Sequence, residues 1–226
     1  MLVEIQRVLG NDDVAAFLVE LEKADWSDGR GSAGYLAHGV KNNEQLPDGH
    51  PLGIELGKRI LTVLETNATF VSAALPLKIV PPLFNRYAVS REYGPHIDGA
   101  IRPVTGTPHR VRTDLSATLF LSSPDSYDGG ELIVADAVGT REIKLDAGDL
   151  VLYSGGSVHR VTPVTRGARY AAFFWIQSMV RGAAERRILF DLDRAIQSVS
   201  AAGAAQDELV RLAGVYHNLL RLWADT

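Results

Sequence analysis

Residues 128–153, DGGELIVADAVGTREIKLDAGDLVLY, indicate the fold of this 226-residue chain. Short runs of aliphatic and β-branched residues, typical of strands, cover 131–134, 142–145 and 150–153. Turn sequences precede or separate these runs at Asp128-Gly129-Gly130, Val138-Gly139 and Asp146-Ala147-Gly148-Asp149. Because runs of this length joined by short turns form hairpins, the stretch predicts antiparallel β structure.

The same pattern continues on both sides of this stretch. Further runs of β-branched and aromatic residues, separated by turns, cover 77–80, 83–87, 116–121 and 169–177. Short strands at this spacing predict an antiparallel barrel or a two-sheet jelly roll. We therefore expect a mostly β fold with flanking helices, built around a double-stranded β-helix (jelly-roll) core.

Helical periodicity replaces the strand pattern outside residues 77–180. Apolar residues recur every three to four positions in segments that predict helices from Asn11 or Asp12 to before Trp26, and over 52–74, 183–199 and 206–223. We expect an N-terminal helical support region (1–76), a jelly-roll core (77–180) and a C-terminal helical extension (181–226). The apolar stripe of the last helix is expected to pack within the chain, with a homo-oligomer seam as the alternative; it comprises Leu209, Leu212, Val215, Leu219 and Leu222.

The composition excludes several classes of protein. With 46% hydrophobic residues, 22% charged residues and a formal net charge of −4, the chain is globular rather than disordered. Lys and Arg number 23 against 27 Asp and Glu, so there is no positive surplus for phosphates and no nucleic-acid partner is expected. No apolar run is long enough to span a membrane and no signal peptide is recognisable, so we expect a cytoplasmic protein without a membrane partner. Without cysteine, any metal must be held by His, Asp or Glu.

One histidine pattern could hold a metal ion. His96 and Asp98 are two residues apart on an extended segment, so their side chains point to the same side. Alone this pair is a weak signal, but His159 follows a predicted strand and could complete the site inside a barrel. Two imidazoles and one carboxylate suit non-haem Fe(II) oxygenases, and zinc hydrolases use similar ligands. Arg169, ten residues after His159, favours the oxygenase because its guanidinium can bind a co-substrate carboxylate.

Several longer motifs make the chain resemble the PKHD-type hydroxylases of bacteria, which are Fe(II)- and 2-oxoglutarate-dependent dioxygenases related to prolyl 4-hydroxylases. The resemblance runs nearly end to end. The motifs are VKNNEQ (40–45), FNRY (84–87), YGPHID (93–98), DLSATLFLS (114–122), YDGGEL (127–132) and HRVTPVTRGARYAAFFWIQSMVR (159–181), with RRILFDLDRAI and GVYHNLLRLWA in the C-terminal extension.

The resemblance implies a role for individual residues. His96, Asp98 and His159 would bind Fe(II), Arg169 would bind the distal carboxylate of 2-oxoglutarate, and Tyr87 matches a tyrosine that helps to hold this co-substrate. Together with O₂, and with ascorbate to keep the iron reduced, such a site would hydroxylate an unactivated C–H bond and release succinate and CO₂. The resemblance also links the chain to bacterial iron acquisition, and so to a siderophore-related or peptide substrate.

Two positions depart from the family pattern or have no assigned role. Related prolyl hydroxylases have a second co-substrate tyrosine where this chain has Phe120, so the hydrogen bond must come from another group or be missing. Arg160 adds a charge directly after His159, with no role assigned.

Other interpretations of the same residues stay open. A non-catalytic cupin-like metal- or ligand-binding module would use the same barrel without turnover, and a metal-dependent hydrolase or isomerase would need no 2-oxoglutarate. A hydroxylase of protein residues would differ only in its substrate. For this chain, the substrate is expected to be a small molecule or a peptide.

Phe173, Phe174 and Trp175 are expected in the core. Asn42, Asn43 and Gln45 are expected in a solvated loop, with a lid over the substrate as the functional alternative.

Overall fold

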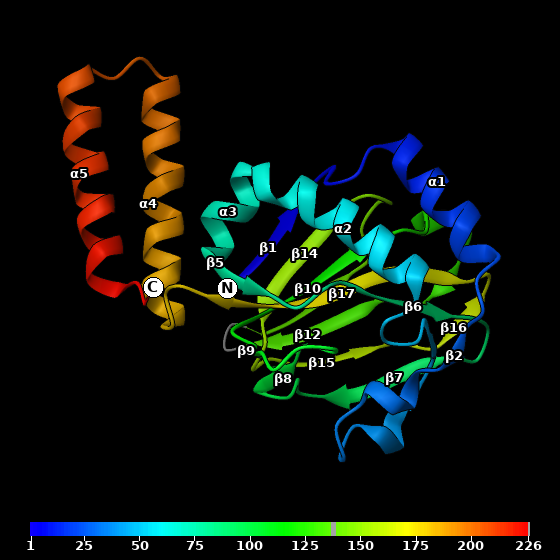
Figure 1. The fold of residues 1–226 in the computed structure, drawn as a ribbon. Helices are drawn as coiled ribbons and strands as arrows, with labels where there is room; N and C mark the ends of the chain where they lie inside the picture. The colour runs from blue at the N-terminus through cyan, green and yellow to red at the C-terminus, as the bar shows by residue number, and fades with distance from the viewer. Residues whose placement is uncertain (137–138, 226) are drawn as a thin grey trace.

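The predicted jelly-roll architecture is confirmed by the computed structural model, which describes residues 1–136 and 139–225. Two antiparallel sheets face each other, helices cover the outer face of the larger sheet, and a helical hairpin stands beside the barrel (Figure 1). Both ends of the chain lie on the side of the barrel that faces this hairpin (Figure 1).

The larger sheet supplies one wall of the barrel. Its strands run in the order β1 (Leu2–Ile5), β14 (Leu150–Ser154), β10 (Leu115–Phe120), β17 (Arg169–Ser178), β6 (Leu83–Tyr87), β4 (Glu44–Gln45) and β2 (Ser27–Asp28), and β5 (Pro76–Ile79) also pairs with β17. Every residue of β10 is buried because this strand lies inside the sheet, between β14 and β17.

The smaller sheet forms the opposite wall. Its order is β13 (Gly139–Ile143), β12 (Leu132–Asp136), β15 (Val158–Val161), β7 (Glu92–His96) and β3 (Lys41–Asn42). Two short ribbons extend the barrel: β8 (Ile101–Pro103) with β9 (Arg110–Arg112), and β11 (Asp128–Gly129) with β16 (Val164–Arg166). The 3-10 turns are η1 (Gly29–Ser32), η2 (His38–Val40) and η3 (Pro124–Ser126).

Each predicted strand matches an observed strand to within three residues at either end. The first, 77–80, corresponds to β5, and the last, 169–177, corresponds to β17. The turn predicted at Val138-Gly139 includes Val138, which lies outside the described residues. The region 1–76 supplies β1 to β4 as well as helices, so it is more than the helical support that we expected. The division of the chain at residues 76 and 180 stays a prediction.

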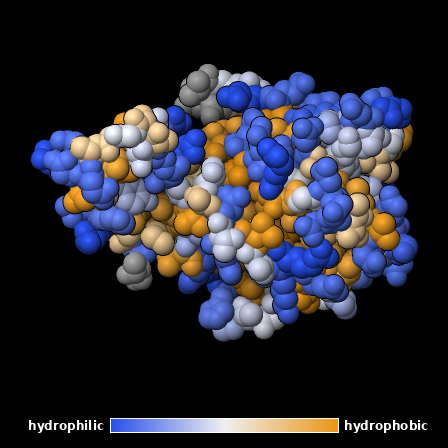
Figure 2. All heavy atoms as spheres, turned by 90° about the horizontal axis from the view of Figure 1, so that it is seen from above, coloured by the Kyte–Doolittle hydropathy of each residue, from blue (hydrophilic) through white to orange (hydrophobic). Residues whose placement is uncertain are grey.

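The main hydrophobic core lies between the larger sheet and its helices α1 (Asn11–Glu22), α2 (Pro51–Thr66) and α3 (Ala68–Ala74). In α1, Val14, Phe17 and Leu21 recur at helical spacing and are buried against the sheet. The molecule seen from above presents hydrophilic residues with hydrophobic residues between them (Figure 2). Within the described residues, no helix is long and apolar enough to cross a membrane.

The single helix predicted over 52–74 is wrong, because the chain breaks at Asn67. Asn67 has extended backbone angles, and its side chain accepts a hydrogen bond from the backbone N–H of Phe70 at 2.9 Å. This is an N-cap, which starts a new helix after the end of α2. Phe70 lies six residues after Leu64, which is not a helical spacing, so the apolar pattern changes face at the break.

The C-terminal extension is a hairpin of α4 (Ala183–Ala201) and α5 (Gln206–Trp223) with an apolar cluster of its own. Leu189 is fully buried there, against Leu75 and Val180 of the barrel. Of the stripe predicted on α5, Leu219 packs on this cluster, whereas Val215 and Leu222 are exposed.

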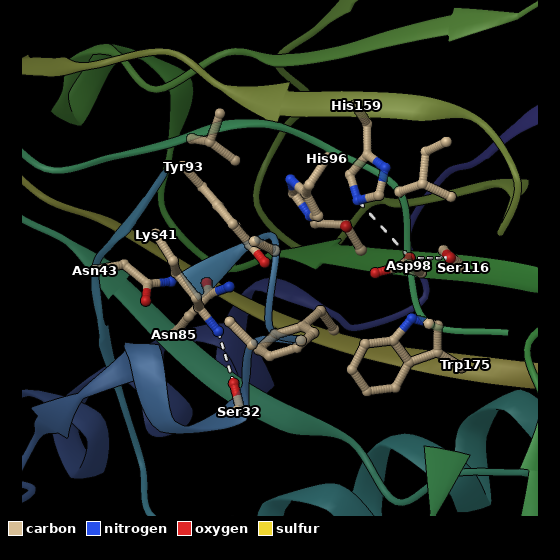
Figure 3. A pocket seen from close by; sticks show the side chains of 18 of the residues that line it. Ser32, Lys41, Asn43, Asn85, Tyr93, His96, Asp98, Ser116, His159 and Trp175 are labelled. Carbon is tan, nitrogen blue, oxygen red and sulfur yellow. Dashed lines mark hydrogen bonds and ion pairs between the residues drawn. The ribbon is translucent and has the colours of Figure 1, made fainter. Parts of the chain in front are cut away.

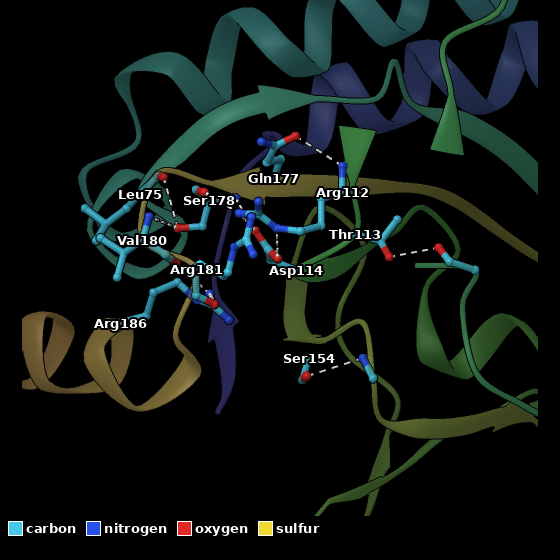
Figure 4. Close-up of polar contacts among 12 residues, drawn as sticks. Leu75, Arg112, Thr113, Asp114, Ser154, Gln177, Ser178, Val180, Arg181 and Arg186 are labelled. Carbon is cyan, nitrogen blue, oxygen red and sulfur yellow. Dashed lines mark hydrogen bonds and ion pairs between the residues drawn. The ribbon is translucent and has the colours of Figure 1, made fainter. Parts of the chain in front are cut away.

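Polar contacts tie the end of β17 to this hairpin (Figure 4). Asp114 accepts hydrogen bonds from Arg112 Nε at 2.7 Å and from the Ser178 backbone N–H at 2.9 Å. The buried Arg186 of α4 donates from Nη1 to the backbone carbonyls of Val180 and Arg181 at 2.7 and 2.8 Å. The hairpin is therefore held by backbone carbonyls, by a small apolar cluster and by a hydrogen bond from Ser72 Oγ of α3 to Asp193 Oδ2 of α4 at 2.6 Å.

Candidate functional site

A cavity of about 320 Å³ lies between the two sheets. Its walls come from β6, β10 and β17 of the larger sheet and from β7 and β15 of the smaller sheet (Figure 3). Residues 32–37 line its mouth. The cavity is large enough for a small organic ligand.

The structure brings His96, Asp98 and His159 together on one wall of this cavity. One possible ligand atom from each residue lies within 4.8 Å of the others, and His159 Nε2 is 3.7 Å from Asp98 Oδ2. His159 lies opposite His96 in the β15–β7 pairing. His159 lies on β15, a strand that the sequence analysis did not predict, and the pairing of β15 with β7 brings it to the site.

Hydrogen bonds orient all three side chains. The Nδ1–H of His96 donates to the Gly94 carbonyl at 2.9 Å, and that of His159 donates to the Ser157 carbonyl at 3.0 Å. Both Nε2 atoms are thereby left as lone-pair donors that can bind a metal. Ser116 Oγ donates to Asp98 Oδ2 at 2.5 Å.

Burial keeps this cluster suited to a cation. Burial, together with the neighbouring His159, lowers the pKa of His96 to about 4, so this imidazole is neutral near pH 7. Two neutral imidazoles and one carboxylate are a donor set that Fe(II) accepts with coordination positions left open. The residues present therefore fit the metal that the sequence resemblance implies.

Arg169 lies on β17 with its side chain almost fully buried, and it lines the same cavity. Its guanidinium carbon is 5.4 Å from the Tyr87 ring centroid and 5.0 Å from that of Phe120. Its Nε has no hydrogen-bond partner, and among the described residues no carboxylate lies within 4.0 Å of it. A buried, unpaired guanidinium is costly, so this environment fits an anionic ligand.

Tyr87 is the cross-strand neighbour of Arg169 and is equally buried. Burial raises the pKa of Tyr87 to about 12, so its hydroxyl stays protonated and can donate a hydrogen bond. Phe120 packs its ring against the Arg169 guanidinium and carries no hydroxyl. Asn43 and Asn85 line the cavity with buried amide atoms that have no hydrogen-bond partner, so the chain offers polar groups other than a second tyrosine.

The segment 41–45 is neither a solvated loop nor a lid. Lys41, Asn43 and Gln45 are buried, whereas Asn42 is exposed and Glu44 is ion-paired with Arg86 on the other side. This alternation is that of an extended chain whose every second side chain faces inward. The period-two spacing of Lys41, Asn43 and Gln45 was the signal that could have revealed this wall of the cavity.

The aromatic run on β17 divides between the core and the cavity. Phe174 is part of the main core, as expected, although it also reaches the cavity lining. Phe173 and Trp175 are on the opposite face of the strand and line the cavity. Arg102, which the sequence did not single out, lies 4.2 Å from the Trp175 ring centroid. Arg160 is exposed and is not among the residues that line the cavity.

Family models match two parts of the chain. The model described as the 2OG-Fe(II) oxygenase superfamily covers residues 82–177, which include all three members of the His–Asp–His cluster. The model described as the PKHD-type hydroxylase C-terminal domain covers residues 184–225, which form the helical hairpin.

Solved structures show the same fold at low sequence identity. A prolyl-4-hydroxylase of Pseudomonas putida superposes with a TM-score of 0.52 at 19% identity, covering 78% of this chain and 92% of that one. A prolyl hydroxylase of Trichoplax adhaerens, solved with a hypoxia inducible factor peptide, gives 0.58 at 16% identity, covering 83% and 86%.

Curated relatives match the chain from end to end. A PKHD-type hydroxylase of Saccharophagus degradans is 55% identical over 226 residues, and one of Bordetella pertussis is 55% identical over 225 residues. Each match covers 100% of both chains. The chain therefore belongs to the PKHD-type hydroxylases, and its barrel is a member of the 2OG-Fe(II) oxygenase superfamily.

Proposed function

We propose that the protein hydroxylates an unactivated C–H bond of a small molecule or peptide, using Fe(II), O₂ and 2-oxoglutarate and releasing succinate and CO₂. One observation carries this proposal: a His–Asp–His cluster and a buried, unpaired Arg169 line the same cavity. Binding of a metal alone makes no use of a buried cation without a counterion, and a hydrolase needs no anion site of this kind.

His96, Asp98 and His159 would hold the iron, and Arg169 would pair with the distal carboxylate of 2-oxoglutarate. When bound, iron and 2-oxoglutarate supply the activation of O₂ and the oxidising power for hydroxylation. The Tyr87 hydroxyl, held protonated by burial, would donate to the same carboxylate as Arg169. The carboxylate of Asp98 occupies a coordination position that a halide would need, which favours hydroxylation over halogenation.

The remaining lining residues would position the substrate and exclude water. Leu132, Phe173 and Trp175 present apolar surface to the cavity between the sheets. Exclusion of water protects the protein from oxidising itself before a substrate is in place. The siderophore link, the ascorbate requirement and the cytoplasmic location stay predictions.

Anaerobic titration of the apoprotein with Fe(II) and then 2-oxoglutarate tests this function. We expect a weak charge-transfer band on the order of 500 nm that saturates with 2-oxoglutarate. Arg169→Ala should weaken 2-oxoglutarate binding about 30-fold or more, because it removes the charged partner of a buried carboxylate. Arg160→Ala is the matched control, since this exposed arginine should leave the affinity unchanged.

The opposite result would point to another class of protein. If the wild type binds iron but no 2-oxoglutarate at millimolar concentration, the hydroxylase proposal fails. A metal-binding module or a hydrolytic metal site would then be the better account of the His96, Asp98 and His159 cluster.

A further inference from the structure

Two further cationic side chains, those of Lys41 and Arg102, line the same cavity as Arg169. The Lys41 ammonium is 5.8 Å from the ring centroid of Phe173, and the Arg102 guanidinium carbon is 4.2 Å from that of Trp175. Phe173 and Trp175 follow Arg169 by four and six residues on β17, which at roughly 3.4 Å per residue is about 13 and 20 Å. Lys41 and Arg102 therefore pack on rings farther along β17 than Arg169, and the Lys41 ammonium is also 5.3 Å from the ring centroid of Tyr93, which stacks on His96.

Lys41 and Arg102 converge on one residue. Lys41 Nζ donates to Ser32 Oγ at 2.6 Å, and Arg102 Nη1 donates to the Ser32 carbonyl at 3.3 Å (Figure 3 shows the first contact). Lys41 Nζ also donates to Gln45 Oε1 at 3.1 Å, which leaves one of its three N–H groups free. All of these acceptors are neutral.

No carboxylate compensates these charges at close range. Lys41 is 5% exposed, and in the described parts of the chain neither cation has a carboxylate oxygen within 4.0 Å. Burial and the neighbouring Arg102 lower the pKa of Lys41 to about 8, so both groups remain charged near pH 7. Binding Ser32 alone would not require a buried lysine and a half-buried arginine, since neutral donors could make the same hydrogen bonds.

The sum of the charges in the cavity, with Fe(II) and 2-oxoglutarate bound, shows that a negative charge is missing. Fe(II), the Asp98 carboxylate, the 2-oxoglutarate dianion and the Arg169 guanidinium cancel one another when the histidines are neutral. The two positive charges of Lys41 and Arg102 are then left in the same cavity without a compensating charge. An anionic group on the substrate would compensate them.

We propose that Lys41 and Arg102 form a subsite for a carboxylate of the substrate, so that the protein acts on carboxylic acids. The inference rests on the proposed function and specifies its substrate class. A carboxylate has two oxygens, which match the free Lys41 N–H and the Arg102 fork. A phosphate would leave a charged oxygen against the aromatic rings of Tyr93, Phe173 and Trp175, and it fits less well.

The test uses the anaerobic Fe(II)·2-oxoglutarate protein and three probes that share a phenyl group. Phenylacetate carries the carboxylate, phenylacetamide is its neutral counterpart, and phenyl phosphate is the alternative anion. Binding is followed by the shift of the charge-transfer band and by calorimetry. We expect phenylacetate to bind at least tenfold more tightly than either of the other probes.

Variants assign the preference to the two residues. Lys41→Met and Arg102→Met should each lower phenylacetate affinity at least tenfold while leaving phenylacetamide and 2-oxoglutarate affinity unchanged. Arg110→Met is the matched control, because Arg110 is exposed on the neighbouring strand β9 and is not among the residues lining the cavity. Circular dichroism and thermal melting check folding, and the half-buried Arg102 gives an independent variant if Lys41→Met does not fold.

Several results would overturn the proposal. Equal binding of acid and amide, no saturable response to either, or a preference for phenyl phosphate would each exclude a carboxylate subsite. Phenylacetate that abolishes the band rather than shifting it would be displacing 2-oxoglutarate from Arg169, which also contradicts the proposal. In all of these cases the charge-transfer band that the wild-type protein gives with Fe(II) and 2-oxoglutarate tests the proposed function separately.

Discussion

At the scale of single residues, the Ser116 hydroxyl controls how Asp98 faces the metal site. Ser116 Oγ donates to Asp98 Oδ2 at 2.5 Å, and this contact restricts the rotation of the carboxylate. We expect Ser116→Ala to weaken Fe(II) or Mn(II) binding about tenfold, as the loss of such a supporting hydrogen bond does in other metal sites. Metal titration by calorimetry or by the electron paramagnetic resonance of Mn(II) measures this change.

The control for this prediction is Ser122→Ala. Ser122 is buried at the end of the same stretch of chain, but it donates to the Ala168 carbonyl and not to a proposed metal ligand. Its loss should lower stability and leave metal affinity unchanged. If both variants bind metal as the wild type does, the Ser116 contact does not orient Asp98 for metal binding.

The sequence could identify some of these residues and not others. His96, Asp98, His159 and Arg169 carry motif and spacing information. Lys41 could not be found in the same way, because lysine is usually exposed and the sequence offered no partner for a buried one. The period-two spacing of Lys41, Asn43 and Gln45 indicates which side chains share a face, but the burial of that face depends on the pairing of β3 with β7, which is a long-range contact.

At the scale of elements, the turn before β12 sets the position of Arg169. Gly130 has φ of +68°, and a Cβ built there would lie 3.0 Å from Tyr127 Cε2 and 3.1 Å from Arg169 Cδ. Gly130→Ala would therefore strain the backbone and displace the Arg169 side chain. We expect 2-oxoglutarate affinity to fall about tenfold and stability to fall by about 1–3 kcal/mol.

Gly106→Ala is the control that separates the effect of backbone strain from the effect of displacing the Arg169 side chain. Gly106 has φ of +75°, but a Cβ added there would meet no atom within 4 Å, so this variant carries only the backbone cost. We expect it to lose stability and keep 2-oxoglutarate affinity. Equal loss of affinity in both variants would show that strain, and not the crowding of Arg169, is responsible.

Asn67 gives a second prediction about elements. Its side chain caps α3 through the Phe70 N–H, so Asn67→Ala should lower the free energy of unfolding by about 1 kcal/mol. Urea denaturation measures this change, with Asn218→Ala in the exposed part of α5 as the control. An unchanged urea midpoint in Asn67→Ala would show that packing alone separates α2 from α3.

These elements also show where sequence reasoning fails. The predicted strands were found because each run is rich in aliphatic, β-branched or aromatic residues and lies between turns, as 150–153 does in β14, whereas β7 and β15 were not predicted. The break at Asn67 was missed because the prediction followed the apolar residues up to Leu64 and then continued the helix to residue 74. Strands of two residues, such as β2 and β3, are too short to carry any period and exist only through their partners.

At the scale of the whole molecule, the barrel and the helical hairpin have separate apolar cores. One apolar cluster of the barrel includes Tyr87, Phe120, Val134 and Val151, and the hairpin cluster shares none of them. Among the described residues, α5 has no fully buried side chain, so the hairpin depends on few contacts. We infer that the hairpin can open locally while the barrel and its cavity stay folded.

Leu189→Ala tests this independence. Leu189 is fully buried between α4 and the barrel, and its truncation should cost about 2 kcal/mol or more in the hairpin. The opened form then becomes about 30-fold more populated, so trypsin should cut α4 at Arg187 or Arg194 faster by about that factor.

Ile188→Ala is the control. Ile188 is 49% exposed, so trypsin should cut this variant at the wild-type rate. The 2-oxoglutarate band should be unchanged in both variants, since the hairpin supplies no residue that lines the cavity. Loss of the band together with the hairpin would instead mean that the two cores unfold as one unit, with Arg112, Asp114 and Ser178 transmitting the change from α4 to β10 and β17.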